Sequence, residues 1–412
     1  MSIARLPAAS LWLIVSGCLL LMLSFGLRSS FGLFVQPIQE VNDWGRDVMG
    51  LALAIQNLAW GVIAVLAGGL ADRFGNVKVL VAGAVLYALG IWMTADVASV
   101  WMLNGGAGFL IGAGVAGTAF GIVLPAMARA VSPSQQQSVL GVGTAAGSMG
   151  QFLLVPVIQR LIDGLGWSGA LHVMAVMALG MAVLAMPLAA RQGAAGSNKM
   201  EPGTQQAEQR LRETLSLARG HASFWMLTLG FFVCGFHIGF ITVHLPPFLA
   251  DAGFDPSVAA WSISLIGLCN VAGALLSGTC SGRFSMRTVL IVIYGGRAVA
   301  ITLFLLLPLS LPSVLGFSAV MGLLWLATVP PTTGLVVAMF GTRYMATLYG
   351  VVFLGHQLGS FSGVWLGGWL FETTGSYDSL WWTAVALSLV AVALHWPISE
   401  RPALDKGRPA SA

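Results

Sequence analysis

The sequence predicts an all-α membrane protein with twelve transmembrane helices in two pseudo-symmetric six-helix bundles. Of its 412 residues, 57% are hydrophobic and only 8% are charged. Apolar stretches of membrane-spanning length recur along the chain, and one polar stretch divides them into six and six. Because soluble domains usually carry about 25% charged residues, the composition argues against a soluble enzyme, a nucleic-acid-binding protein and a disordered chain.

Each predicted helix is an apolar stretch long enough to cross a bilayer. A hydrocarbon core of about 30 Å requires about 20 apolar residues per helix. The first stretch follows Arg5, as in a signal peptide, but it is too long and eleven more follow, so we interpret it as a retained helix. The predicted spans are residues 11–36, 48–70, 78–96, 100–128, 137–162, 168–190, 222–249, 258–281, 288–308, 313–340, 345–371 and 379–397.

Residues 191–220 form the longest polar stretch and predict a linker. This stretch contains several glycines, Pro202 and two adjacent glutamines, a composition typical of flexible connections. It could end in a short amphipathic helix over 207–218. We therefore predict an N-terminal bundle over 1–190, a cytoplasmic linker over 191–220 and a C-terminal bundle over 221–412.

The distribution of charge predicts an orientation. With the N-terminus inside and alternating spans, fifteen of the 19 lysines and arginines fall on the inner side. Arg46 and Arg160 fall outside, and Arg28 and Arg297 lie within helices. This bias follows the positive-inside rule. We expect a multi-pass protein of a bacterial inner membrane, with both termini in the cytoplasm.

An internal repeat relates the two halves. Residues 68–75 follow the second span and residues 278–285 follow the eighth, at an offset of 210. The glycine pairs of residues 141–150 and 350–359 repeat at an offset of 209. Parallel repeats of six helices are a known transporter architecture, in which the substrate binds between the halves near the membrane midplane.

The loop after the second span carries a family motif. Residues 68–78, GGLADRFGNVK, resemble the loop signature of the major facilitator superfamily. The resemblance covers essentially the whole chain and implies a secondary transporter that works by alternating access. It also implies that Asp72 and Arg73 form a conformational latch with neighbouring helix ends. Otherwise the two residues belong to a solvated loop.

Two further stretches resemble the bacterial monocarboxylate porters and oxalate/formate exchangers. Residues 28–34 place a cation before a short Ser/Phe stretch, and residues 141–150 repeat glycines on the fifth span. The resemblance implies an organic anion as substrate. The chain departs from that branch on the eighth span, which carries Asn270 and no charge before Arg283.

Arg28 is the candidate anchor for a substrate carboxylate. A charge in hydrocarbon costs at least about 2.5 kcal/mol, so it must face a cavity or a partner. The only acidic residue in the predicted spans is Asp96, at the very end of the span over 78–96, so no acid lies deep in the membrane. A carboxylate substrate would neutralise Arg28 with bidentate geometry. The alternative is a packing arginine that binds helix-end carbonyls or extends toward the interface.

Other ionisable residues lie within predicted spans. Arg297 is either an anion-site arginine or a structural one. His237 and His244 are seven residues apart on a predicted cavity helix and are candidates for proton coupling, with His237 and His356 also candidates for substrate binding. Ordinary interhelical hydrogen bonding is the alternative for all three histidines. The prolines at 246–247 are expected to break or kink the outer end of this helix.

Uncharged polar and aromatic residues complete the candidates. Each buried amide must find a partner, which is either the substrate or another helix. Tryptophans deep in the spans could stack on a planar substrate or fill space beside glycines. The amides are Gln56, Asn57, Gln151 and Asn270, and the deep tryptophans are Trp60, Trp325 and Trp365.

The function that we predict is secondary transport of a small organic anion of the monocarboxylate type, with possible proton coupling, by a monomer in the lipid bilayer. No catalytic constellation, nucleotide-binding loop or metal motif appears, so we expect no enzyme activity, no cofactor and no nucleic-acid partner. The four cysteines form no CxxC pair. The alternatives are a carrier of a planar or aromatic solute, such as a vitamin or drug, and a membrane sensor or scaffold that moves no solute.

Overall fold

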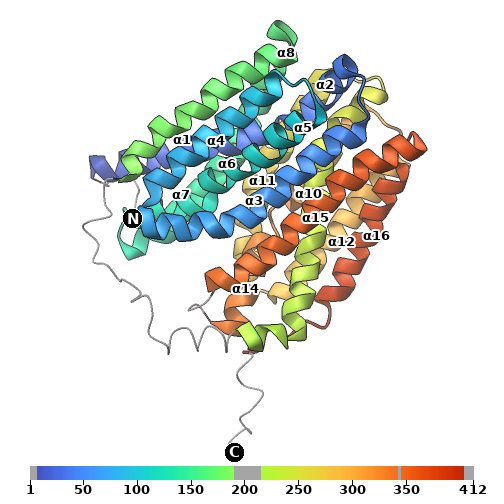
Figure 1. Ribbon diagram of the computed structural model, residues 1–412. Helices are drawn as coiled ribbons and strands as arrows, with labels where there is room; N and C mark the ends of the chain where they lie inside the picture. The colour runs from blue at the N-terminus through green and yellow to red at the C-terminus, as the bar shows by residue number, and fades with distance from the viewer. Residues whose placement is uncertain (1–6, 190–214, 342–344, 403–412) are drawn as a thin grey trace, which may run out of the picture.

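Long apolar helices pack side by side in the described part of the chain. The computed structural model describes residues 7–189, 215–341 and 345–402, and all regular structure within these ranges is helical (Figure 1). The predicted linker lies almost entirely outside the described residues, so the division of the chain at 191–220 stays a prediction. We call the helices before residue 190 the N-bundle and those after residue 215 the C-bundle, because each group packs chiefly on itself.

Broken helices are common in both bundles. The N-bundle contains α1 (Ala8–Ser29), η2 (Phe31–Phe34), α2 (Val35–Asn42), α3 (Arg46–Phe74), α4 (Asn76–Ala95), α5 (Val100–Leu103), the π-helix η3 (Asn104–Leu110), α6 (Ile111–Thr118), α7 (Phe120–Ala128), α8 (Pro133–Ala185) and η4 (Met186–Ala189). The C-bundle contains α10 (Ala222–Asp251), α11 (Pro256–Ser281), α12 (Met286–Leu306), α13 (Leu311–Leu324), α14 (Val329–Phe340), α15 (Met345–Thr374) and α16 (Asp378–His395).

The described helices agree with the twelve predicted spans. Ten helical stretches are long and apolar enough to cross a membrane. One of them, Ser138–Leu188, turns sharply at Gly166, where φ is 71°, and so comprises two of the predicted spans. The remaining span is α15, which is 30 residues long and packs against both α10 and α3.

Three spans differ in detail from the prediction. The span over 100–128 contains a π-helical stretch and breaks at Ala119, whose backbone is extended. The span over 313–340 breaks between Leu324 and Val329. Of the break or kink expected at Pro246–Pro247, the break does not occur, because α10 continues through both prolines to Asp251. Neighbouring helices bury both prolines, and this packing offsets the two lost helical hydrogen bonds.

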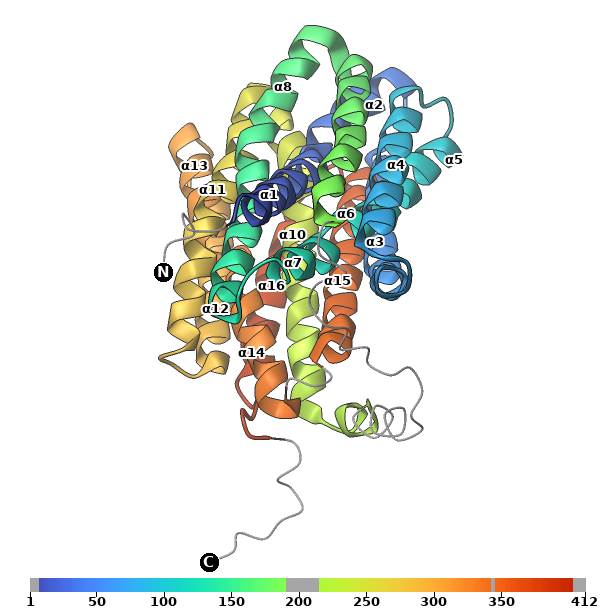
Figure 2. The same cartoon turned by 90° about the vertical axis from the view of Figure 1, so that its left-hand side faces the viewer.

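The two bundles touch at one end and lie apart at the other. Arg46 begins α3 and contacts the C-bundle, whereas α3 ends near Gly75. We call these the Arg46 end and the Gly75 end. Figures 1 and 2 show α3 and α7 lying away from α14 at the Gly75 end. A Cβ built at Gly121, Gly141 or Gly350, which lie toward that end, would meet nothing within 4 Å.

Glycines allow the closest helix contacts. A Cβ on Gly359 of α15 would overlap the carbonyl oxygen of Phe232 on α10, and a Cβ on Gly235 would overlap the carbonyl of His356. Between the bundles, Gly50 of α3 faces Gly368 of α15, with 3.3 Å between the built Cβ and the Gly368 Cα. Small residues at such positions let helix backbones approach in membranes, where van der Waals packing drives association.

Two alanine substitutions on α15 test this packing. At a helix position where the new Cβ meets no neighbour, Gly→Ala stabilises the folded protein by up to about 1 kcal/mol. We expect Gly350→Ala to be neutral or stabilising, because its Cβ meets open space. We expect Gly359→Ala to lose about 1–3 kcal/mol through overpacking. Thermal unfolding of the purified protein in detergent measures both, and equal unfolding temperatures would contradict the packing.

Candidate functional site

Arg28 lies near the end of α1, between the two bundles. Its Nη2 donates to Oδ1 of Asn57 on α3 at 2.5 Å, and its Cζ lies 4.8 Å from the ring centroid of Trp60. Its Nε is buried and has no hydrogen-bond acceptor in the described part of the chain. The ion pairs found there do not include Arg28. The guanidinium is therefore a cation without a counter-charge.

A small cavity adjoins Arg28. Its volume is about 10 Å³, which holds about one water molecule, so the bundles are nearly closed around the site on the side of the Arg46 end. Its walls come from α1 and η2, α3 and α10. They are formed by Arg28, Phe31, Gly32, Leu53, Gln56, Asn57, Gly239, Thr242 and Val243.

The prolines of α10 shape the C-bundle wall of this cavity. Pro246 and Pro247 have no N–H, so the carbonyls of Thr242 and Val243 lack their helical donors. Gly32 packs directly against these two carbonyls, and any Cβ there would overlap the Thr242 oxygen. The prolines thus leave α10 helical while removing the ordinary helical donors of two carbonyls that face Gly32.

The predicted amides of α3 lie beside Arg28. Gln56 donates to the carbonyl of Ala107 in η3 at 2.8 Å, and Asn57 donates to the carbonyl of Leu53 at 2.9 Å. Asn57 therefore presents its oxygen to Arg28 in a fixed orientation. The structure brings Arg28, Gln56 and Asn57 together around one cavity.

Gln151 and Asn270 join the bundles along α8 and α11. Gln151 donates to the carbonyl of Ile263 at 2.8 Å and accepts from Ser29 at 3.3 Å. Asn270 donates to Ser148 at 2.8 Å. Both amides therefore form interhelical hydrogen bonds in this conformation, and Gln151 is linked to the Arg28 region through Ser29.

Arg297 and His237 lie inside the C-bundle. Arg297 is fully buried and donates to the carbonyls of Leu324 at 2.7 Å and Trp325 at 2.5 Å. These carbonyls belong to the end of α13, where the break leaves them without helical donors. His237 Nε2 lies 2.9 Å from the carbonyl of Ala384 on α16. Neither residue lines the Arg28 cavity, so their contacts in this conformation are structural.

His356 lies on α15 beside the ring of Phe353. Its ring is nearly parallel to that of Phe353, with centroids 5.9 Å apart, and its Nδ1 is 2.9 Å from Oε1 of Gln357. Gln357 in turn donates to the backbone carbonyl of Asn57 at 2.9 Å. His356 thus contacts the residue that joins α15 to α3.

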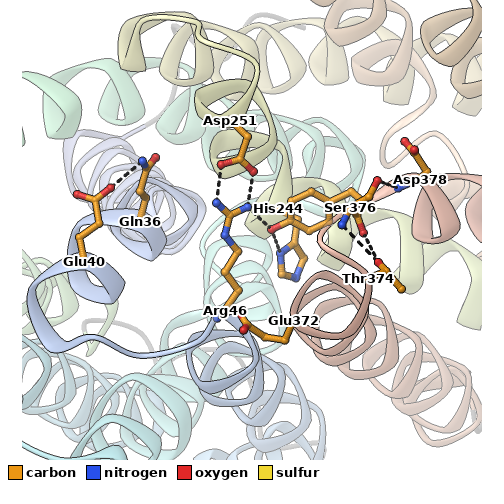
Figure 3. A network of polar contacts seen from close by, with 10 residues as sticks. Gln36, Glu40, Arg46, His244, Asp251, Glu372, Thr374, Ser376 and Asp378 are labelled. Carbon is orange, nitrogen blue, oxygen red and sulfur yellow. Dashed lines mark hydrogen bonds and ion pairs between the residues drawn. The ribbon is translucent and has the colours of Figure 1, made fainter.

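Arg46 forms a clamp between the bundles (Figure 3). Its guanidinium binds Asp251 of α10 in a bidentate pair, with distances of 2.5 and 2.6 Å, and its backbone N–H donates to Glu372 of α15 at 2.6 Å. Phe371 covers the guanidinium at 3.8 Å. Only 5% of Arg46 is exposed. One residue of the N-bundle therefore holds two helices of the C-bundle.

His244 and Tyr377 extend the clamp inward. Burial raises the pKa of Tyr377 to about 12, so the phenol is neutral. Its oxygen accepts from Arg46 at 3.2 Å, so its O–H is free to donate to Nδ1 of His244, also at 3.2 Å. The Nε2–H of His244 then donates to the carbonyl of Val364 at 2.8 Å. Of the two histidines on α10, His244 is the one bonded to the clamp.

The sequence did not identify Arg46 as functional. It was expected only as one of two basic residues on the outer side, and the partner Asp251 lies far away in the sequence. Of the predicted latch, the Asp72 side chain lies outside the described part of the chain, and Arg73 is exposed beside Phe74. Trp60 is the deep tryptophan that meets Arg28. Trp325 is buried at the α13 break, and Trp365 stacks on Phe361 with 40% exposure.

Comparisons with known proteins agree on the family. The family model of the Major Facilitator Superfamily matches residues 17–364 and 253–412. The uncharacterized MFS-type transporter YcxA of Bacillus subtilis is 25% identical over 394 residues, covering 92% of this chain and 91% of its own. Monocarboxylate transporter 11 of Mus musculus is 28% identical, covering 87% of this chain and 80% of its own.

The fold is also that of solved transporters. A bacterial homolog of the human lysosomal transporter Spinster, in an inward-facing and occupied conformation, superposes with a TM-score of 0.74. It covers 96% of this chain and 98% of its own, at 16% sequence identity. At that identity the likeness concerns the fold alone.

A double-mutant cycle tests the clamp. We expect Arg46→Gln and Asp251→Asn to show a coupling free energy of about 1–3 kcal/mol, because each leaves a charge without its partner. Detergent unfolding of the wild type, both single variants and the double variant measures it. The control pair is Gln36 and Glu40, which bond at 2.8 Å on the exposed α2 and should show no measurable coupling. Additive effects at Arg46 and Asp251 would contradict the clamp.

Proposed function

The chain belongs to the Major Facilitator Superfamily, and we propose that this secondary transporter carries a small organic anion of the monocarboxylate type, with Arg28 as its anchor. The observation that supports the proposal is the position of Arg28 between the bundles without an acidic partner in the described part of the chain. The family consists of transporters rather than enzymes. Relatives at 24–28% identity include monocarboxylate transporters.

The electrostatics of Arg28 support an anionic solute. A guanidinium away from water is destabilised unless an anion or several acceptors surround it. Asn57 supplies one neutral acceptor, and the free Nε leaves an edge on which a carboxylate can bind in the bidentate manner that arginine favours. A neutral solute would leave the charge uncompensated.

Alternating access then requires the Arg46 end to open. In the present conformation the clamp and the glycine contacts of α3 with α15 hold that end closed. Rocking of one bundle on the other would break the Arg46–Asp251 pair and the amide bonds of Gln151 and Gln357. These bonds are few and polar, so water and solute can replace them when the end opens.

The membrane orientation is part of the same proposal. Among the described residues, Arg73, Lys78, Arg129, Arg283 and Arg287 lie at the Gly75 end of the helices. The positive-inside rule places that end in the cytoplasm. The protein would then lie in a bacterial inner membrane, with the present conformation closed toward the outside.

Proton coupling is proposed at His244. Its ring is bonded through Tyr377 to Arg46, so a proton gained at His244 would place a second positive charge beside the clamp. His237 bonds to α16 and Arg297 within one bundle and lacks such a link. His244→Gln is expected to make uptake independent of an imposed proton gradient, while equilibrium exchange continues.

Transport by Arg28 variants tests the anchor. We expect Arg28→Gln to reduce proteoliposome uptake of the carried anion at least about tenfold, because the charge-assisted bonds are lost. A panel of lactate, pyruvate and phenylpyruvate serves as probe. Arg160→Gln, an exposed arginine at the other side of the N-bundle, is the matched control and should keep wild-type uptake.

Other outcomes of that assay distinguish the alternative functions. Uptake of a neutral planar solute that is unchanged in Arg28→Gln would support a carrier of vitamins or drugs instead. Binding of a solute by the wild type without any flux would support a sensor or scaffold. Either result would overturn the organic-anion proposal.

A further inference from the structure

A row of aromatic rings crosses from one bundle to the other beside Arg28. Phe120 of α7 stacks on Phe25 of α1 at 4.2 Å, and Phe25 meets the edge of Trp60 at 6.0 Å. Trp60 of α3 then meets Phe353 of α15 at 5.4 Å with an interplanar angle of 73°. The Trp60–Phe353 contact joins the N-bundle to the C-bundle. We call these four residues the aromatic row.

The aromatic row lies where the closed part of the interface ends. Toward the Arg46 end, Gln357 donates to the carbonyl of Asn57 and the cavity holds about one water. Toward the Gly75 end, Gly350 of α15 has open space around it. Phe25, Phe120 and Phe353 are only half-buried. A solute that approaches Arg28 from the Gly75 end therefore meets these rings.

We propose that the anion carries an aromatic ring, so that the solute is an aryl-substituted carboxylate, with Trp60 and Phe353 as the residues that select it. This inference rests on the proposed function. The Cζ of Arg28 lies 4.8 Å from the centroid of the Trp60 ring. A carboxylate bound to the free edge of the guanidinium would therefore lie beside that ring. An aryl substituent can then pack on Trp60 and Phe353, whereas a two- or three-carbon acid is too short to cover them.

The position of the pair also links binding to transport. Trp60 and Phe353 belong to different bundles, so a ring inserted between them contacts both. A ligand shifts a conformational equilibrium only through contacts that differ between the states. An aryl group at this place makes such contacts, while a carboxylate held by the N-bundle alone does not. His356, stacked on Phe353 and bonded to Gln357, fixes the ring that faces Trp60.

Matched pairs of acids test the inference. Pyruvate and phenylpyruvate, and acetate and phenylacetate, differ only by the ring. We expect the aryl member to bind wild type about tenfold more tightly, as aromatic contacts and burial of a phenyl ring imply. Thermal stabilisation of the purified protein gives the affinities, and competition for uptake into proteoliposomes gives the transport preference.

Two variants localise the preference. Phe353→Leu should reduce the aryl advantage to less than about threefold while leaving the affinity for the aliphatic member near the wild-type value. Trp60→Leu should reduce the aryl advantage in the same way, but it also removes the ring beneath the Arg28 guanidinium, so its affinity for the aliphatic member is expected to fall as well. Trp365→Leu is the control, because this tryptophan is 40% exposed and packs with Phe361 and Trp369 away from Arg28. It should keep the full advantage. Retained binding of the aliphatic acid also shows that the variants are folded.

The outcomes separate this inference from the proposed function. Equal binding of aryl and aliphatic acids by wild type, or an aryl advantage that both leucine variants keep, would overturn the aromatic selectivity and leave the anion proposal standing. Binding that survives in Arg28→Gln, or no binding of any acid by wild type, would overturn the anion proposal, and the selectivity would fall with it.

Discussion

Polar groups in the hydrocarbon region must find partners within the protein, and this constraint shapes every polar contact between the helices. Arg297 illustrates it. The break after α13 leaves the carbonyls of Leu324 and Trp325 without helical donors, and the buried guanidinium supplies three hydrogen bonds to them. The break and the arginine are compatible with the membrane only together. The contacts of Arg297 in this conformation are therefore structural, although its charge alone pointed equally to an anion site.

Three arginines meet the same constraint in different ways. Arg297 is compensated by carbonyls within one bundle, and Arg46 by the carboxylate of Asp251 in the other bundle. Arg28 has one amide oxygen and the face of Trp60. Its compensation by groups of the described chain is incomplete, and this is the reason why we propose Arg28 as the anion site. The difference lies in the partners and not in the residue type.

The interface between the bundles can both close and separate. Direct backbone approach at Gly50 and Gly368 gives close packing without large side chains that would interlock. The other bonds between the bundles include amide and hydroxyl contacts and the Arg46 clamp with its ion pair. Such contacts hold one conformation and exchange readily for water. The aromatic row lies at the depth where this closed interface ends, which is the level at which we propose that the solute binds.

The sequence by itself determined the membrane class, the helical spans and the superfamily, because hydropathy, charge asymmetry and a local motif are all properties of short stretches, and it predicted a role for Arg28. Only the tertiary structure decided which polar residues meet. Asn57 accepts a hydrogen bond from Arg28, whereas Arg297 and His237 bond groups within the C-bundle. Arg46 forms an ion pair with Asp251, which is 205 residues away in the sequence. Trp60 contacts the ring of Phe353 in the other bundle. The physical reason is that helix rotation and bundle packing set which face of each span points inward, and twelve nearly uniformly apolar helices carry little local signal for that choice.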